Sequence, residues 1–183
     1  MVTAFEPFGS DDHNPTMALL EALTGDVIKV LLPVSYKRAA KTLKKAISDN
    51  RPDAVICTGL AGGRSDICLE RAALNIKDAD IPDNDGEKAR GEAVIPGGEN
   101  ALFTSLPVYE FADTLKKEGF PCRVSYNAGT YVCNSTYFYL LETKVPGVFI
   151  HIPYDESFGK TPFLQLEESV KAVSRLIELM EEQ

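Results

Sequence analysis

The sequence has few of the side chains from which metal sites are usually built. It contains only two histidines and four cysteines, at Cys57, Cys68, Cys122 and Cys133. No two of these cysteines form a C-x-x-C pair, whereas structural zinc sites depend on closely spaced ligands. We therefore expect no metal and no cofactor. Scattered cysteines are usually free thiols in a reducing compartment, although spacing alone leaves a chance disulfide open.

Positive charge is also scarce. The chain has 19 Lys and Arg against 27 Asp and Glu, which gives a formal net charge of −8. Proteins that bind nucleic acid need clustered cations to displace counterions from phosphates. The longest basic run is Lys44-Lys45, with Lys41 nearby, and its spacing is typical of a solvated helix face. We predict that nucleic acid is not a partner.

Long apolar runs are missing as well. None approaches the roughly 18 residues that are needed to span a bilayer. The N-terminal stretch MVTAFEPFGSDDHNP lacks the basic-then-apolar layout of a secretion signal. We therefore expect a cytoplasmic protein that does not interact with membranes.

The chain instead alternates short apolar runs with amphipathic stretches. Runs rich in β-branched residues predict strands, and apolar residues three and four apart predict helices. Strands are predicted over 1–5, 26–34, 52–59, 121–127 and 147–153, with 67–76 as a further candidate; helices are predicted over 14–25, 35–50, 106–120, 133–144 and 161–183. This order predicts an α/β fold: a single-domain three-layer α/β/α sandwich over residues 1–183, with a mostly parallel but mixed, twisted sheet.

Four segments at the ends of predicted strands should converge in space. In open α/β sheets, ligands collect at the carboxyl ends of the strands. That rule groups residues 5–9, 58–63, 127–133 and 151–154. The segment from 61 to 100 is rich in glycine, proline and acids. Such a long irregular segment inside a compact domain is usually functional or interfacial.

Cys133 follows a glycine-containing turn and begins a predicted helix. The partial positive charge of a helix N-terminus lowers the pKa of a thiol and favours the thiolate. The pattern alone leaves two readings open, a nucleophile and a buried hydrophobe. Cys57, Cys68 and Cys122 fit core packing.

Two further residues are candidates for a site built around that cysteine. His151 ends a predicted strand, and it is either a base for the cysteine or a satisfied core residue. Glu70 lies in a semi-apolar run, and it either orients the imidazole or pairs with Arg71 on an edge strand. The stretch GLAGGR matches neither nucleotide-binding glycine motif, so we expect no bound nucleotide.

Several short motifs, taken in order, carry a family resemblance. They are FEPFG with NPT, GLAGGR, LERAALN, DADIPDNDG, SYNAGTYVCN and FIHIPY. Together they cover nearly the whole chain, and the sequence resembles the pyroglutamyl peptidase I family, also called pyrrolidone-carboxylate peptidase. The resemblance implies a cysteine exopeptidase that removes N-terminal pyroglutamate from peptides through an acyl-enzyme intermediate. It implies Cys133 as the nucleophile, His151 as the base and Glu70 as the acid of the triad.

The resemblance also implies a substrate pocket and an assembly. Phe5 and Phe8 would sandwich the flat lactam ring, and Asn14 would brace their loop. The remaining contacts would come from an apolar wall and one backbone group, contributed by Ile81, Tyr131, Val132 and, through its backbone, Leu60. The partners would be peptides with N-terminal pyroglutamate and other copies of the chain, because family members are commonly tetrameric.

The sequence departs from the family pattern at several positions. Tyr131 stands where phenylalanine is common, Leu60 replaces a frequent glutamine, and Asp80 stands where an arginine is often found. Members also carry several more residues before the first strand. Two alternatives therefore remain beside the peptidase: a non-catalytic member that binds pyroglutamyl peptides, and an α/β hydrolase that acts on another amide.

Overall fold

A computed structural model describes residues 1–9 and 11–182. Its centre is a six-stranded sheet with the strand order β2-β1-β3-β8-β4-β7. These strands span Lys29–Leu32, Val2–Phe5, Val55–Leu60, Gly147–Ile152, Ile67–Glu70 and Cys122–Ser125. The first four run parallel, β4 runs antiparallel to β8, and β7 runs parallel to β4. The sheet is therefore mixed and mostly parallel, which confirms the predicted fold class.

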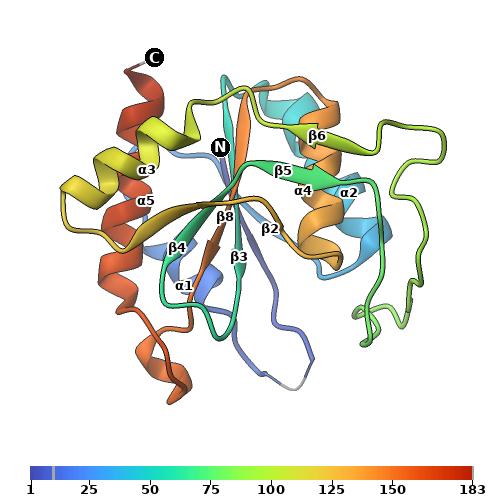
Figure 1. Ribbon diagram of the computed structural model, residues 1–183, viewed down its shortest axis with the longest axis horizontal. Helices are drawn as coiled ribbons and strands as arrows, with labels where there is room; N and C mark the ends of the chain where they lie inside the picture. The colour runs from blue at the N-terminus through green and yellow to red at the C-terminus, as the bar shows by residue number, and fades with distance from the viewer. Residues whose placement is uncertain (10, 183) are drawn as a thin grey trace.

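Helices cover both faces of the sheet, as Figure 1 shows. One layer contains α1 (Pro15–Ala22), α3 (Val108–Lys117) and α5 (Leu166–Glu181). The other contains α2 (Tyr36–Asn50) and α4 (Val132–Glu142). A short 3-10 helix, η1 (Glu156–Phe158), follows β8. Within residues 1–9 and 11–182, none of the helices is long and apolar enough to cross a membrane.

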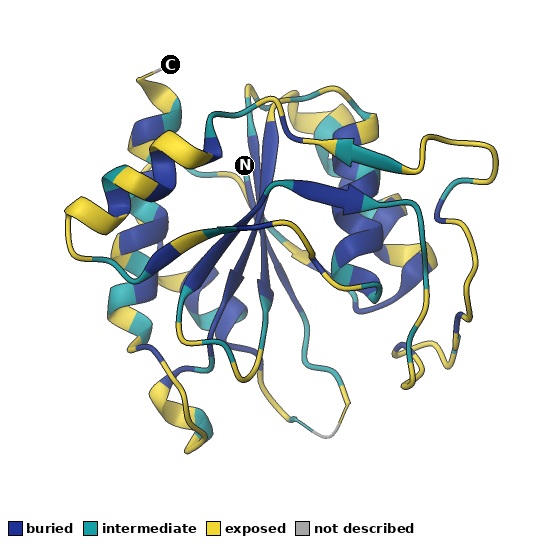
Figure 2. Cartoon of the chain, viewed as in Figure 1, coloured by how far each residue is buried: buried dark blue, intermediate teal, exposed yellow. Residues whose placement is uncertain are grey.

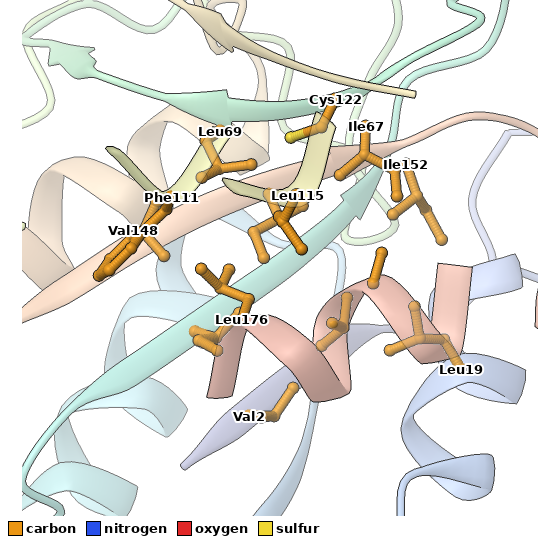
Figure 3. Close-up of a cluster of buried hydrophobic side chains, with 14 of the residues drawn as sticks. Val2, Leu19, Ile67, Leu69, Phe111, Leu115, Cys122, Val148, Ile152 and Leu176 are labelled. Carbon is orange, nitrogen blue, oxygen red and sulfur yellow. The ribbon is translucent and has the colours of Figure 1, made fainter. Parts of the chain in front are cut away.

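Two apolar cores fill the spaces between the three layers. On the α1 and α5 side, Val148, Ile150 and Ile152 of β8 join a cluster with Leu19 and Leu176, part of which Figure 3 displays. Successive side chains of a strand point to opposite faces. Phe149 and His151 therefore face α2 and α4. Figure 2 shows the central strands largely buried and the outer helix faces exposed.

The predicted candidate strand over 67–76 is in fact two strands. Ile67–Glu70 pairs in the central sheet, whereas β5 (Ala72–Leu74) forms a second, two-stranded sheet with β6 (Ala101–Phe103). The chain crosses from one sheet to the other at Arg71. Strand β6 was not predicted, because three residues are too few to show an alternating pattern.

The predicted helix boundaries also shift, and α1 and α3 are each shorter than predicted. Helix α4 begins at Val132, so Cys133 is its second residue rather than its first. The last helix begins at Leu166, and residues 161–165 form a loop in which Phe163 bridges to Tyr154. Pro162 restricts its preceding residue to extended conformations, which helps to exclude helix there.

Candidate active site

The four predicted segments meet at one cavity of about 280 Å³. Its lining residues come from all of them: Phe5, Phe8, Leu60, Ala61, Gly62, Ala128, Gly129, Tyr131, Val132, Cys133 and His151, with Asn14, Val34 and Arg64 beside them. A second cavity of about 340 Å³ lies between α1 and η1 and shares Asn14 with the first. The smaller cavity holds the thiol and the buried imidazole, so it is the candidate site.

The convergence is confirmed, but the strand-end rule explains only part of it. Strands β1, β3 and β8 are parallel, and their carboxyl ends bring residues 5–9, 58–63 and 151–154 together. Strand β7 runs in the opposite direction to β8, because β4 is antiparallel to β8 and parallel to β7. The turn after β7 must therefore reach across to deliver residues 127–133 to the cavity.

His151 and Glu70 form a buried pair at the centre of the sheet. Glu70 lies opposite Phe149 in the antiparallel ladder, and Cys68 lies opposite His151. Diagonal positions of this kind place the two side chains on the same face. Nδ1 of His151 lies 2.8 Å from Oε1 of Glu70, and both residues are almost wholly inaccessible to solvent. The carboxylate thus fixes the orientation of the ring through Nδ1. Nε2 is the ring nitrogen that does not bind Glu70.

Cys133 lies in the first turn of α4. The first N–H groups of any helix lack intrahelical acceptors and point at whatever lies in front of them. Tyr131 occupies the N-cap in an extended conformation. Behind the thiol, strand β3 comes so close that a Cβ added to Gly59 would stand 3.0 Å from Sγ of Cys133. The absence of a side chain at Gly59 therefore makes the space that the thiol occupies.

Asn134 anchors this first turn. Its Oδ1 accepts a hydrogen bond from the N–H of Leu74, and its Nδ2 donates to the carbonyl oxygens of Leu74 and Ile76. Asn134 is fully buried. These bonds fix the start of α4 to β5, so Cys133 projects from a rigid support.

Burial decides the protonation of the thiol and the imidazole. It raises the pKa of the Cys133 thiol to about 12, although the residue as a whole is only partly buried, with Cys57 and Glu70 acting in the same direction. It also lowers the pKa of His151, against the opposing hydrogen bond and charge of Glu70. The low thiol pKa predicted from the helix N-terminus is therefore wrong, because lost solvation outweighs the helix field. Both shifts favour the uncharged forms of the thiol and the imidazole at neutral pH.

Glu70 remains ionised beside them. Burial alone would raise the pKa of this carboxyl, but the hydrogen bond from His151 and the charge that its ring gains at low pH, with smaller contributions from Ser125 and Arg64, bring it below its usual range. The predicted alternative, a pair with Arg71 on an edge strand, is wrong. Strand β4 lies inside the sheet between β8 and β7, and Arg71 donates instead to the carbonyl oxygen of Thr104.

Comparisons with known proteins show the family to which the chain belongs. A family profile described as pyroglutamyl peptidase matches residues 1–183. The chain belongs to the pyroglutamyl peptidase family. The pyrrolidone-carboxylate peptidase of Bacillus amyloliquefaciens is 37% identical over 188 residues, covering 94% of this chain and 87% of that protein. The pyrrolidone-carboxylate peptidase of Thermosipho melanesiensis is 40% identical over 168 residues, covering 86% and 83%.

Solved structures of the pyroglutamyl peptidase family have the same fold. The pyrrolidone carboxyl peptidase of Thermococcus litoralis superposes with a TM-score of 0.92 at 36% identity, covering 100% of this chain and 94% of that one. Pyroglutamyl peptidase I of Bacillus amyloliquefaciens gives a TM-score of 0.89 at 36% identity, covering 94% and 89%.

Most of the predicted pocket residues lie around the cavity. Phe5 packs on Phe149 with ring centroids 6.4 Å apart, and Phe8 lies 6.1 Å from the ring of Tyr131. Asn14 donates to the carbonyl oxygen of Glu6 and caps α1, so it ties the Phe8 loop to the helix.

Ile81 is the predicted pocket residue that lies outside this arrangement. Its side chain is 46% exposed, and it is not part of the cavity lining. The segment that carries it lies at the surface, and the backbone N–H of Tyr36 donates a hydrogen bond to the carboxylate of Asp83, two residues after Ile81.

The departures from the family pattern have distinct settings. The hydroxyl of Tyr131 donates to the carbonyl oxygen of Pro82 at 2.9 Å, which links the cavity wall to the segment after β5. Leu60 ends β3, pairs in register with Ile152 and lines the cavity. Asp80 is exposed on the surface segment.

Arg64 is a residue at the site that the sequence did not predict. It borders the cavity and donates to Oε1 of Glu70 at 2.9 Å. It falls one position beyond the strand-end group 58–63, and neither the nucleotide-loop comparison nor the family resemblance gave the arginine of GLAGGR a role. Its position directly after a strand was the available signal. In the described part of the chain, no group of three or more His, Cys, Asp or Glu side chains is arranged to hold a metal ion.

Proposed function

We propose that the protein hydrolyses the N-terminal pyroglutamyl residue of peptides, with Cys133 as nucleophile, His151 as general base and acid, and Glu70 as the residue that orients His151. One observation carries this proposal. The imidazole of the buried His151–Glu70 pair and a thiol in the first turn of a helix line the same small cavity. A nucleophile, a base and an orienting acid are the groups from which acyl transfer is built.

The acylation step follows from the uncharged resting state. Nε2 of His151 accepts the thiol proton as Sγ of Cys133 attacks the pyroglutamyl carbonyl carbon. The carbonyl oxygen takes up the electron pair and becomes an oxyanion. Backbone N–H groups in the first turn of α4, including that of Cys133, stabilise this oxyanion. The carbon–nitrogen bond then breaks, and the imidazolium protonates the leaving amine.

Deacylation repeats these proton transfers with water. Nε2 of His151 accepts a proton from water, whose oxygen attacks the thioester carbon. The carbon–sulfur bond breaks, the sulfur regains the proton from the imidazolium, and pyroglutamate leaves. Glu70 holds the ring in one orientation and stabilises its charged form in both steps, without itself taking a proton.

The shape and polarity of the cavity support pyroglutamate as the substrate group. The lactam is flat, compact and uncharged, and the walls contributed by Phe5, Phe8, Tyr131 and Val132 are mainly apolar. In this proposal the backbone carbonyl of Leu60, a residue that lines the cavity, accepts a hydrogen bond from the lactam N–H. An ordinary N-terminus would bring an ammonium group, which is costly to bury without a partner.

Turnover of pyroglutamyl β-naphthylamide tests this function. We expect cleavage of this compound and negligible cleavage of alanyl β-naphthylamide, whose amine is charged. Cys133→Ala should remove turnover, whereas the matched variant Cys122→Ala should retain it, because Cys122 lies in the opposite core. Glu70→Gln should lower kcat. Absence of turnover by the wild-type protein would refute the peptidase, and full turnover by Cys133→Ala would refute the nucleophile.

One observation favours a second candidate, a non-catalytic member that binds pyroglutamyl peptides. Burial raises the pKa of Cys133 to about 12, so attack depends wholly on proton transfer to His151, and without that transfer the site would only bind. Isothermal titration with a pyroglutamyl peptide separates the two functions. Binding without product release by the wild-type protein would support this candidate instead of the peptidase.

We further propose that residues 1–183 fold as one unit and assemble as a cytoplasmic homotetramer. The four cysteines, all among the described residues, are free thiols, which suits a reducing compartment. Phe103 and Tyr126 are each 60% exposed and Phe163 is 43% exposed; large exposed apolar side chains of this kind often mark interfaces. Light scattering after size exclusion tests the assembly, and a monomeric mass would refute it.

A further inference from the structure

Arg64 touches both halves of the candidate active site. Its Nη1 donates to Oε1 of Glu70 at 2.9 Å, and its Nη2 donates to the carbonyl oxygen of Asn127 at 3.2 Å. We infer that Arg64 is a positioning residue for the proposed reaction: it holds Glu70 toward His151 and fixes the turn that leads to Cys133. This inference rests on the proposed function and adds to the triad a residue that acts through it.

The first contact restrains the carboxylate. Arg64 and His151 both bind Oε1 of Glu70, at 2.9 Å and 2.8 Å. Within the described residues, Oε2 of Glu70 is buried and has no hydrogen-bond partner. A carboxylate held at one oxygen by two donors cannot exchange its oxygens without breaking both bonds, and bonds to charged groups are the stronger ones. Arg64 therefore opposes rotation of Glu70 away from the imidazole.

The second contact restrains the turn before the nucleophile. The side chain of Asn127 accepts a hydrogen bond from the N–H of Gly129, whose φ of +80° suits glycine. Arg64 holds the backbone carbonyl of the same asparagine. Because β7 runs opposite to β8, this turn must carry the chain back to the cavity before α4 begins. Arg64 therefore links this turn to the loop after β3, next to the carboxylate of Glu70.

The charge of Arg64 also influences the imidazole that it does not touch. Burial is the main cause of the lowered pKa of His151, and the positive charge of Arg64 acts in the same direction. A guanidinium sharing Oε1 with the ring disfavours a second positive charge there. The imidazolium formed during attack is therefore more ready to return its proton to the leaving amine. Removing Arg64 should raise the pKa of His151.

Steady-state kinetics on three variants test the inference. Arg64→Met removes the charge and both hydrogen bonds, and Arg64→Lys keeps the charge but not the planar two-pronged geometry. Arg123→Met is the matched control, because Arg123 pairs with Asp66 and is half exposed. We expect Arg64→Met to lower kcat roughly tenfold to hundredfold, as small misplacements of reacting groups do, with KM little changed. Arg64→Lys should recover part of the loss, and Arg123→Met should match the wild type.

The pH dependence adds a readout that a merely structural role would not move. The acidic limb of the kcat/KM profile should shift to higher pH in Arg64→Met, because the raised pKa of His151 delays formation of its neutral base. Thermal unfolding of all variants reports their folding. An unchanged limb, or a loss confined to KM, would overturn the inference, since the latter would mean that Arg64 binds substrate directly.

Titration of His151 by NMR tests Arg64 without any turnover. The chain has only two histidines, so a His13→Gln background leaves one imidazole signal to follow. We expect that signal to titrate at higher pH in Arg64→Met than in the parent protein. An unshifted titration overturns the role of Arg64, whereas a wild-type protein without turnover overturns the proposed function. The two failures are therefore distinguishable.

Discussion

Gly59→Ala should disable the thiol with only a moderate cost in stability. A Cβ at this position would stand 3.0 Å from Sγ of Cys133 and 2.8 Å from the ring of Phe149. Comfortable contacts between such atoms are about 3.5–4.0 Å, so the neighbours must move by roughly 0.5–1 Å. Misplacement of a reacting group by about 1 Å can cost about a hundredfold in rate. Overpacking of a core typically costs about 1–3 kcal/mol of unfolding free energy.

The assay for this variant pairs turnover of pyroglutamyl β-naphthylamide with urea unfolding. Gly147→Ala is the matched control. Gly147 begins β8, at the end of the strand away from His151, and a Cβ added there would stand 2.8 Å from Cδ2 of Leu140. Both variants should lose similar stability, and only Gly59→Ala should lose roughly a hundredfold in kcat/KM. Equal losses of activity in the two variants, or full activity in Gly59→Ala, would refute the reasoning.

Four further predictions follow from the same site. The pKa of His151 lies below its usual 6.5, so kcat/KM should hold below pH 6.5 before falling; a limb at or above 6.5 would contradict this. As pH falls, His151 is protonated at higher pH in the unfolded chain than in the folded protein, so the melting temperature measured by circular dichroism should decline below about pH 6.5. A constant melting temperature would argue against a neutral buried imidazole. Iodoacetamide should label Cys133 before the three buried cysteines, at a rate that rises steadily with alkaline pH, as peptide mass spectrometry can follow; faster labelling of Cys57 would exclude this arrangement. Tyr131→Phe removes a hydrogen bond to Pro82, so KM should rise about fivefold, as expected for about 1 kcal/mol, while kcat stays unchanged; a loss in kcat alone would mean that the hydroxyl acts on the chemistry.

Much of the fold could be predicted from the sequence, because the patterns that indicate helices and strands are local. Asn14 and Pro15 were enough to mark the start of α1, since capping depends on neighbours within one turn. Apolar strands alternating with amphipathic helices fixed the layered α/β class. The ordered motifs pointed to the family, and strand ends pointed to the convergence of Phe5, Cys133 and His151. Each of these depends on residue types and order along the chain.

Other features depended on tertiary structure. The reversed direction of β4 and β7 places Glu70 diagonally across from His151, and strand direction is set by long-range pairing that no local pattern records. Arg64 contacts Glu70 only because the loop between β3 and β4 brings its side chain to the end of β4. The thiol pKa was misjudged for the same reason. A helix N-terminus is visible in sequence, but the burial of Cys133 that outweighs it exists only after the layers pack together.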